Sequence, residues 1–389
     1  MTLPDAVVIG AGHNGLVAAN VLADAGWSVV VHEAEPEPGG AVASGELLEP
    51  GFVSDRYSSF YPLGAASPVF GALGLEIPWR HGPLVLAHPS ADGSCAVLER
   101  GPASELWQRT EPALLEAMTT PFPQVRAAPR LALAPPLVRL PHDPLERRIV
   151  IGNALHTDAP PTSPLGRAFG AILTGLGRRY GYPCVAGGAA IVTKLLTERA
   201  ERRGVEIRCG ERVERVPHAR HAVIAAIDGW SLGRLLGRQW RMPPDPATVK
   251  VDWTLDGPIP WTAEPARRSP VVHLGGPDAF AIVGQYSMAD PTRMPAGKEV
   301  AWSYSHQLDA GGIEAAVEQL APGFRSLIRE RRVEQLPPGR LNGGTAKRLR
   351  LRRPEVAHRI FLGSMSAHPG GGVHGAPGWI AAQAALRTR

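Results

Sequence analysis

The fold is decided near the start of the chain, where residues 6–34 read AVVIGAGHNGLVAANVLADAGWSVVVHEA. The apolar run Ala6-Val7-Val8-Ile9 is typical of a parallel strand that is covered on both faces. It leads into Gly10-Ala11-Gly12-His13-Asn14-Gly15, after which apolar residues recur at helical spacing. A second strand is expected over residues 27–31, and Glu33 stands at its end. Strand, glycines, helix, strand and acid in this register predict a Rossmann-type unit that binds a dinucleotide.

Each glycine of this loop has a distinct physical role. Gly10 permits the tight turn out of the strand, and Gly12 lets a pyrophosphate approach the main chain. Gly15 lets the helix pack closely on the sheet. The free N–H groups of the helix N-terminus then hold the phosphates, and Glu33 is placed to accept hydrogen bonds from a ribose.

A second glycine pair indicates which dinucleotide is bound. After Glu33 the chain reads Ala34-Glu35-Pro36-Glu37-Pro38-Gly39-Gly40-Ala41. An NAD-dependent dehydrogenase usually proceeds directly into its next crossover helix. A sharp glycine turn at this point favours FAD, whose ribityl chain passes close to the backbone.

Composition narrows the class of protein. The chain has 389 residues, of which 44% are hydrophobic, enough for two lobes with a substantial core. The net charge of +5 is spread along the chain, so nucleic-acid binding is not suggested. The three cysteines show no CxxC pair and no metal-ligand spacing with histidine, so we expect no disulfide scaffold and no metal. The chain lacks a basic leader and an apolar run of ~18 residues, which favours a soluble cytoplasmic protein.

Three motifs together resemble a known family. They are Val7–Ala19, Pro38-Gly39-Gly40-Ala41 and Ala367-His368-Pro369-Gly370-Gly371-Gly372-Val373-His374-Gly375, and the segment 183–216 is also similar. The chain resembles the FAD-dependent oxidoreductases of the phytoene desaturase type, and within them the group around pyridine nucleotide-disulphide oxidoreductase domain-containing protein 2. The resemblance implies a FAD-binding domain interrupted by a substrate domain, with the C-terminal motif against the flavin.

The resulting fold class is α/β, with a Rossmann-type FAD-binding domain and an interleaved α+β substrate domain. Residues 249–255, 271–274, 280–286 and 300–306 are predicted to form an antiparallel sheet, the first of these strands half-buried. The FAD-binding domain is expected over residues 1–60, 183–235 and 340–389. The substrate domain is expected over residues 61–182 and 236–339.

The candidate site residues come from both the pattern and the resemblance, which places Val213 at the adenine. The predicted cofactor-binding residues are Gly10, Gly12, His13, Asn14, Gly15, Glu33, Ala34, Gly39, Gly40, Ala41, Val213, Ala226, Gly363, Gly371, Gly372, Val373 and His374. We expect His13 to contribute its backbone.

The candidate catalytic residues are His374 and His368, which flank the C-terminal glycines, and Tyr61. The resemblance places the segment around Tyr61 and Ser59 beside the isoalloxazine ring. Trp302, Tyr304 and His306 share one face of a predicted strand. That face could line a pocket over the flavin or belong to ordinary core.

The leading functional hypothesis is a FAD-dependent oxidoreductase that removes hydride from a largely apolar organic substrate, by desaturation or dehydrogenation. A lipid or natural-product tailoring step would fit. One alternative is a flavin amine oxidase, and another is a flavin-binding scaffold or interaction protein without turnover. The sequence leaves the oligomeric state open and gives no support to peripheral membrane contact.

Overall fold

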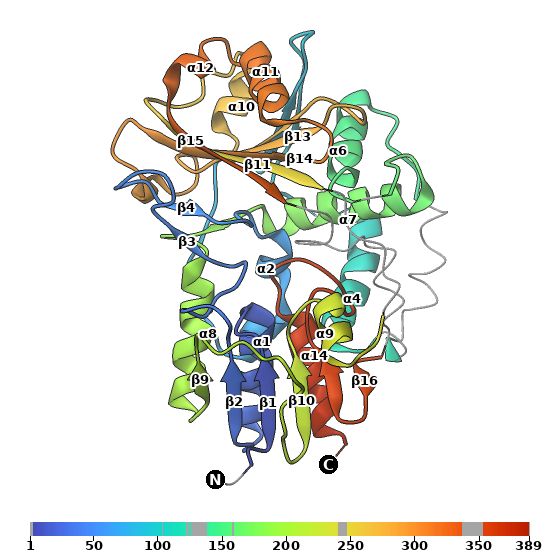
Figure 1. Ribbon diagram of the computed structural model, residues 1–389. Helices are drawn as coiled ribbons and strands as arrows, with labels where there is room; N and C mark the ends of the chain where they lie inside the picture. Colours follow the sequence, from blue (N-terminus) through green and yellow to red (C-terminus); the bar gives the residue numbers. More distant parts are fainter. Residues whose placement is uncertain are drawn as a thin grey trace.

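The computed structural model describes residues 3–102, 104–121, 124–125, 138–157, 159–239, 247–336 and 353–388. Two sheets organise these residues, one near the chain termini and one at the opposite end of the molecule (Figure 1). Among the described residues, no helix combines the length and the apolar character required to cross a bilayer.

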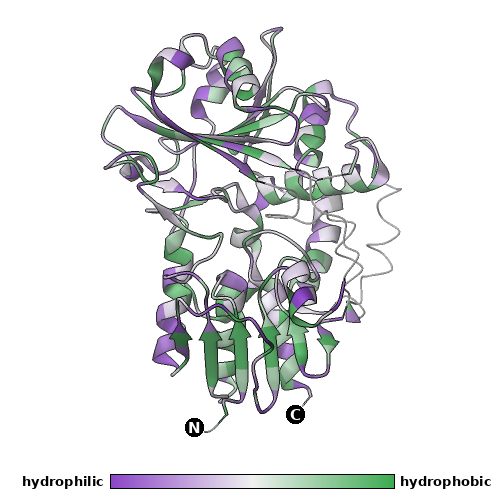
Figure 2. Cartoon of the chain, viewed as in Figure 1, coloured by the Kyte–Doolittle hydropathy of each residue, from purple (hydrophilic) through white to green (hydrophobic). Residues whose placement is uncertain are grey.

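The first sheet has six strands and carries the N-terminal motif. Its order is β16 (Glu355–Ala357), β17 (Ile360–Leu362), β10 (Ala222–Ala225), β1 (Ala6–Ile9), β2 (Val29–His32) and β9 (Glu206–Arg208). All neighbours are parallel except β16 and β17. β1 and β10 are buried along their whole length, which explains their continuous apolar sequence, and Figure 2 shows the strands of this sheet as mainly hydrophobic.

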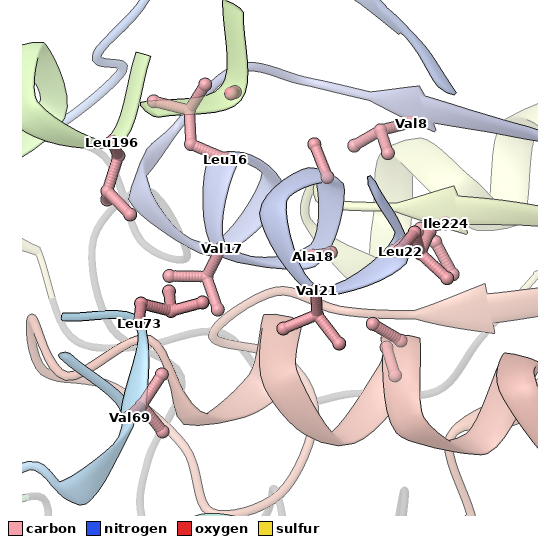
Figure 3. Packing of buried hydrophobic residues seen from close by; sticks show 14 of the residues in the cluster. Val8, Leu16, Val17, Ala18, Val21, Leu22, Val69, Leu73, Leu196 and Ile224 are labelled. Carbon is pink, nitrogen blue, oxygen red and sulfur yellow. The ribbon is translucent and has the colours of Figure 1, made fainter. Parts of the chain in front are cut away.

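Three helices form a layer beside this sheet. α1 (His13–Asp24) contacts both α8 (Ala190–Arg202) and α14 (Ala376–Leu386). Figure 3 shows side chains of α1 among Leu196 of α8 and Ile224 of β10. The helix layer therefore joins the start, the middle and the end of the chain in one hydrophobic core.

The second sheet has seven strands and is almost entirely antiparallel. Its order is β15 (Ile328–Leu336), β11 (Thr248–Leu255), β14 (Glu299–Ser305), β13 (Ala281–Gln285), β12 (Val271–Leu274), β6 (Leu86–Pro89) and β7 (Cys95–Leu98). Only β12 and β6 pair in parallel. α6 (Pro144–Ala154) and α7 (Pro164–Tyr180) lie beside its β6–β7 end, and α10 (Glu264–Arg268), α11 (Ala310–Leu320) and α12 (Phe324–Leu327) cover its far side (Figure 1).

The remaining elements lie outside the two large sheets. They are β3 (Ser44–Gly45) with β4 (Ser54–Asp55), β5 (Trp79–Arg80) with β8 (Cys184–Val185), α2 (Pro62–Ala66), α3 (Pro68–Ala72), α4 (Glu105–Thr119), α9 (Gly229–Leu235) and a 3₁₀ turn at Pro291–Arg293.

The predicted fold class is confirmed. Every strand of the parallel sheet lies in the ranges expected for the FAD-binding domain, and every strand of the antiparallel sheet lies in the ranges expected for the substrate domain. The helices do not separate in the same way. α4 lies in the range expected for the substrate domain, but it packs against α14, which lies in the range expected for the FAD-binding domain. The domain boundaries stay a prediction, and the expected boundary at residue 340 lies outside the described residues.

One strand prediction is wrong in its burial. The sequence predicts a half-buried β11, but both of its faces are covered, and only Val249 is partly exposed. The sequence analysis also does not indicate α6, although Asp143 caps it by accepting from the backbone N–H of Glu146 at 2.8 Å, and Pro144 occupies its first turn.

The contact between α1 and α14 can be tested at Gly378. A β-carbon added to Gly378 would stand 1.9 Å from the backbone oxygen of Asn14, so one of the two helices would have to move. We expect Gly378→Ala to lower the free energy of unfolding by about 2 kcal/mol in urea titration, because overpacking of this kind is costly. The matched control is Gly71→Ala in α3, where no atom lies within 4 Å of the added carbon. Equal stability of the two variants would contradict the close contact.

Candidate active site

The N-termini of α1 and α14 meet at one place. α1 begins directly after Gly12, and α14 begins after Gly375, which has a φ of 73° and offers no side-chain cap. The Gly378–Asn14 approach holds the first turns of the two helices together. The positive ends of two helix dipoles therefore converge, which favours an anionic ligand.

Residues 10–15 form the loop that is predicted to bind phosphate, called the phosphate loop below. This loop has the geometry expected from its glycines. Gly10 has a φ of 96°, which favours glycine. A β-carbon on Gly15 would stand 1.9 Å from the backbone oxygen of Gly10, so this position must lack a side chain for the helix to reach the strand. A β-carbon on Gly12 would meet no atom within 4 Å, so the protein itself leaves room there.

Glu33 holds this loop against the end of β2. Glu33 is 8% exposed, and its carboxylate accepts from the backbone N–H of Ala11 at 2.7 Å and from that of Glu35 at 3.0 Å. Each carboxylate oxygen keeps further acceptor capacity. Glu33 can therefore brace the loop and still accept a hydrogen bond from a ligand, although the ribose contact stays a prediction.

Two buried polar atoms of the loop have no protein partner among the described residues. They are Nε2 of His13 and Oδ1 of Asn14. Burial lowers the pKa of His13 to about 3, with His374 as a second cause, so this imidazole is neutral at pH 7. Buried polar atoms are nearly always hydrogen-bonded, so these two atoms indicate a place that a ligand completes.

The second glycine pair lies over the loop. The backbone N–H of Gly39 donates to the backbone oxygen of Ala11 at 3.0 Å. A β-carbon on Gly40 would stand 3.3 Å from Cα of Gly12. Ala41, next in the chain, lines the cavity described below, and Ala34 is half-buried between Glu33 and this turn.

The remaining predicted cofactor residues follow neighbouring strands. Ala226 comes directly after β10, and its backbone N–H donates to the backbone oxygen of Ile9 at 2.8 Å. Gly363 follows β17 and donates to the backbone oxygen of Ala225 at 2.9 Å. Val213 lies beyond β9 in a segment without regular structure, near the point where the backbone N–H of Glu211 donates to the Glu33 carbonyl at 2.8 Å. No contact with a ligand is defined for any of them, so their roles stay predictions.

A cavity of about 230 Å³ lies between the phosphate loop and the antiparallel sheet. One wall is formed by His13, Gly372 and Val373 from the two ends of the chain. Tyr304 and Lys250 belong to the opposite wall. The structure therefore places the C-terminal glycine motif and the predicted substrate sheet on either side of one cavity.

The register of the sheet explains which side chains form the second wall. Tyr304 of β14 pairs with Lys250 of β11 on one side and with Ile282 of β13 on the other, and directly paired residues share a face. Trp302, two residues from Tyr304, stacks on it with ring centroids 5.9 Å apart and planes 5° apart. The face of Trp302, Tyr304 and His306 lines the cavity, while Trp302 also belongs to a buried hydrophobic cluster, so both proposed roles apply.

Lys250 is a site residue that the sequence analysis missed. It is 3% exposed, and its ammonium group pairs with the buried carboxylate of Asp252. Burial lowers the pKa of Lys250 and raises that of Asp252, while their mutual attraction opposes both shifts. The available signal was the Lys-x-Asp alternation in β11, but such alternation is more typical of a face that meets solvent.

A second buried network connects the cavity wall to the short strands β4 and β8. Arg293 donates to Asp55 at 2.9 Å, to Asp290 at 3.2 Å and to the Val185 carbonyl at 2.6 Å. The hydroxyl of Tyr286 donates to Asp55 at 2.9 Å and lies 2.6 Å from Oγ of Ser59.

Ser59 lines the cavity, and its place beside the isoalloxazine ring stays a prediction. Its hydroxyl is fixed by Tyr286, and Tyr286 by the Asp55–Arg293 pair. The charged side chains of Asp55 and Arg293, which are far apart in the sequence, therefore fix the orientation of this part of the cavity wall.

The three predicted catalytic residues lie behind the wall. Nδ1 of His374 accepts from the backbone N–H of Ala376 at 3.2 Å, and its Nε2 donates to the Gly371 carbonyl at 3.2 Å. Nε2 of His368 donates to the Ala117 carbonyl at 3.0 Å, and burial lowers the pKa of His368 to about 4.

The hydroxyl of Tyr61 donates to the Ser58 carbonyl, and burial raises the pKa of Tyr61. In the part of the chain that the structure describes, none of His374, His368 and Tyr61 lines the cavity. Their catalytic assignment stays a prediction, and the observed contacts suit positioning of the backbone.

Comparison with known proteins places this geometry in context. A family model described as an NAD(P)-binding Rossmann-like domain matches residues 8–71. A limonene dehydrogenase subunit of Castellaniella defragrans is 42% identical over 72 residues, a match that spans 18% of this chain and 13% of that protein.

Solved structures are similar along nearly the whole chain. An oxidoreductase from Methanosarcina mazei has a TM-score of 0.67 at 15% identity, covering 98% of this chain and 99% of its own. Cyclohexylamine oxidase from Brevibacterium oxydans has a TM-score of 0.64 at 17% identity, covering 99% of both chains. Putrescine oxidase bound to putrescine has a TM-score of 0.63 at 16% identity, covering 99% of this chain and 98% of its own. The chain has the fold of these oxidoreductases.

The Arg293 network can be tested by removing its cation. Arg293→Met would leave Asp55 and Asp290 buried without their partner, and breaking a buried ion pair in this way costs about 3–5 kcal/mol. We expect that loss in the free energy of unfolding. The control is Arg268→Met, which removes an exposed pair with Glu264 and should cost less than about 1 kcal/mol. If Arg293→Met lowers the free energy of unfolding by less than about 1 kcal/mol, the network does not stabilise the junction of β4 and β8.

Proposed function

We propose that the protein is a FAD-dependent oxidoreductase that removes hydride from a largely apolar organic substrate, by desaturation or dehydrogenation. The observation that carries the proposal is the cavity with one wall from the phosphate loop and the C-terminal glycine motif and the other from the antiparallel sheet. Much of its lining is apolar or aromatic, including Phe60, Ile282, Trp302 and Val373. Such a space suits a small organic molecule pressed against a flat ring.

The residues present fit FAD. The paired N-termini of α1 and α14 would hold its negatively charged groups, and the space over Gly12 admits a diphosphate. Nε2 of His13 and Oδ1 of Asn14 are buried polar atoms that a ligand could satisfy. When bound, FAD supplies the hydride acceptor.

The protein's own residues contribute orientation, exclusion of water and charge. Trp302 and Tyr304 hold the substrate from the sheet side. Val373 and Gly372 place the start of α14 beside the reacting centre, where a helix N-terminus stabilises developing negative charge by about 0.3–1 kcal/mol, and up to ~2 kcal/mol where the site is partly buried. The backbone contacts of His374 hold that helix end in place.

Oxidation of an amine is the second candidate. Trp302 and Tyr304 present parallel rings at the cavity, an arrangement that can attract a cationic or polar amine. Two proteins with this fold are a cyclohexylamine oxidase and a putrescine oxidase. The local similarity to a limonene dehydrogenase polypeptide instead supports a hydrocarbon-like substrate.

The experiment is anaerobic bleaching of the purified yellow protein. Limonene and related apolar compounds form one panel, and cyclohexylamine and putrescine form the other. Bleaching by the first panel supports the proposal, and bleaching by the second alone supports amine oxidation. A yellow protein that no panel reduces favours the flavin-binding scaffold, and a colourless protein that takes up NAD but not FAD would overturn all three.

Gly12→Val tests the cofactor site. Because no protein atom lies within 4 Å of the β-carbon position, we expect the variant to fold with near-normal circular dichroism. The added methyl groups would crowd the diphosphate, so flavin absorbance per protein should fall at least tenfold. Gly71→Ala is the control and should keep its flavin. Full retention of flavin by Gly12→Val would count against the phosphate loop as the binding site.

A further inference from the structure

The side chain of Tyr304 points from the antiparallel sheet into the central cavity. β14 lies between β11 and β13, and Tyr304 is its one partly exposed residue, while the others are buried. Trp302 and His306, two positions before and after it, flank its ring at centroid distances of 5.9 and 5.8 Å. Because these neighbours cover the ring along the strand, the hydroxyl end of Tyr304 is the part that meets the cavity.

Two other polar side chains of the lining are already bonded to protein atoms. Nδ1 of His156 lies 3.2 Å from the hydroxyl oxygen of Tyr304, and its Nε2 lies 3.1 Å from Nε2 of His273. The hydroxyl of Tyr182 donates to Oδ1 of Asn153 at 2.9 Å. A phenol hydroxyl can donate one hydrogen bond and also accept, so Tyr304 is able to form a further bond with a ligand.

The unpartnered nitrogen of His273 decides whether Tyr304 donates or accepts that bond. Nδ1 of His273 is buried and has no hydrogen-bond partner among the described residues. A β-carbon on Gly152 would stand 2.6 Å from this nitrogen, so a Cα hydrogen of Gly152 points toward it. A C–H group can face a lone pair but is repelled by an N–H, and buried N–H groups without an acceptor are rare. His273 therefore carries its proton on Nε2.

This proton position fixes the hydrogen bonds as far as the cavity. Nε2 of His273 donates to Nε2 of His156, and Nδ1 of His156 then donates to the hydroxyl oxygen of Tyr304. Burial lowers the pKa of His156 to about 4 and that of His273 well below its usual value, so both imidazoles are neutral at pH 7. Burial also raises the pKa of Tyr304, which keeps its proton. The O–H of Tyr304 is thus left to donate into the cavity.

The charges at the cavity disfavour a cationic group beside Tyr304. Within the described ranges, the residues that line the cavity include no aspartate or glutamate. Lys250, which pairs with Tyr304 in the register of the sheet, brings an ammonium group to the same face. Its partner Asp252 is not part of the lining. A protonated amine would therefore depend on aromatic rings alone and would lie beside another cation, whereas a neutral acceptor avoids both costs.

We infer that the substrate carries a neutral oxygen function, a carbonyl or a hydroxyl, whose oxygen accepts a hydrogen bond from the hydroxyl of Tyr304. The inference rests on the proposed function and narrows its substrate class from apolar molecules in general to those with such an oxygen. The wall formed by Gly372 and Val373 faces the carbon that is oxidised, and Tyr304 holds the oxygen at the opposite wall. Tyr304 therefore selects the substrate and orients it.

The direction of the hydrogen bonds can be measured on the yellow holoprotein without turnover. In long-range ¹H–¹⁵N spectra of protein labelled in histidine, we expect His156 to be protonated on Nδ1 and His273 on Nε2. The variants His156→Gln and His273→Gln assign the two sets of signals. Protonation of His156 on Nε2 would mean that Tyr304 donates inward and offers only an acceptor to the cavity, which would overturn the inference.

Cyclohexanone and methylenecyclohexane test the recognition of oxygen, because they have the same shape and differ in C=O against C=CH₂. Their dissociation constants are measured from the change in flavin absorbance of the holoprotein. One hydrogen bond supports a preference of about fivefold for the ketone. Tyr304→Phe should abolish this preference without weakening the binding of methylenecyclohexane. Tyr57→Phe is the matched control, because it removes a hydroxyl at the cavity that donates to Glu334 at 3.0 Å, and the preference should remain.

The outcomes separate the two proposals. Colourless protein would overturn the proposed cofactor. Yellow protein that apolar compounds bleach, but that binds cyclohexanone no better than methylenecyclohexane or not at all, would overturn the inference and leave the oxidoreductase proposal intact. Tighter binding of cyclohexylamine than of cyclohexanone at pH 7 would also overturn it. A preference for cyclohexanone that only Tyr304→Phe removes, with normal flavin absorbance and circular dichroism, would support recognition of oxygen over a merely structural role for Tyr304.

Discussion

The contact between the first turns of α1 and α14 is the constraint on which the rest of the structure depends. The two helix ends approach so closely at Gly378 and Asn14 that no side chain fits between them. Two positive helix ends at one place repel each other, and an anion between them removes that cost. The two buried polar atoms without protein partners in the described part of the phosphate loop lie on α1 at this same junction, on His13 and Asn14. The arrangement thus favours a bound, negatively charged ligand.

Two groups of buried charged side chains differ in how completely they are hydrogen-bonded. Arg293 is fully buried, but Asp55, Asp290 and a backbone carbonyl satisfy its donors. The Lys250–Asp252 pair at the cavity is less complete. Oδ2 of Asp252 and Nη1 of Arg332 are 3.8 Å apart, and both are buried without a hydrogen-bond partner among the described residues. A satisfied network resists change, whereas a partly satisfied one can respond to a ligand.

The antiparallel sheet serves two purposes at once. The face that carries Trp302 and Tyr304 provides the wall of the cavity, and the strands β12 and β6 at its other end carry His273 and His88. Because β6 pairs in parallel with β12, residues from near position 88 and near position 273 become neighbours. The same sheet therefore joins the wall of the cavity to residues from two distant parts of the chain.

The sequence by itself determined the β1–α1–β2 unit, the tight turn at Gly10, the close packing at Gly15, and the face that Trp302 shares with Tyr304. These features depend on residues close together in the chain, where spacing and steric freedom leave few choices. Only the tertiary structure decided that Lys250 is buried at the cavity and that Arg293 pairs with Asp55. A polar residue in an alternating strand is read as exposed unless its distant neighbours are known, because burial and pairing depend on what folds over that face. Asp143 and Pro144 are typical of a helix start, but they did not by themselves predict α6. Packing of α6 beside β6 and β7 depends on the tertiary structure.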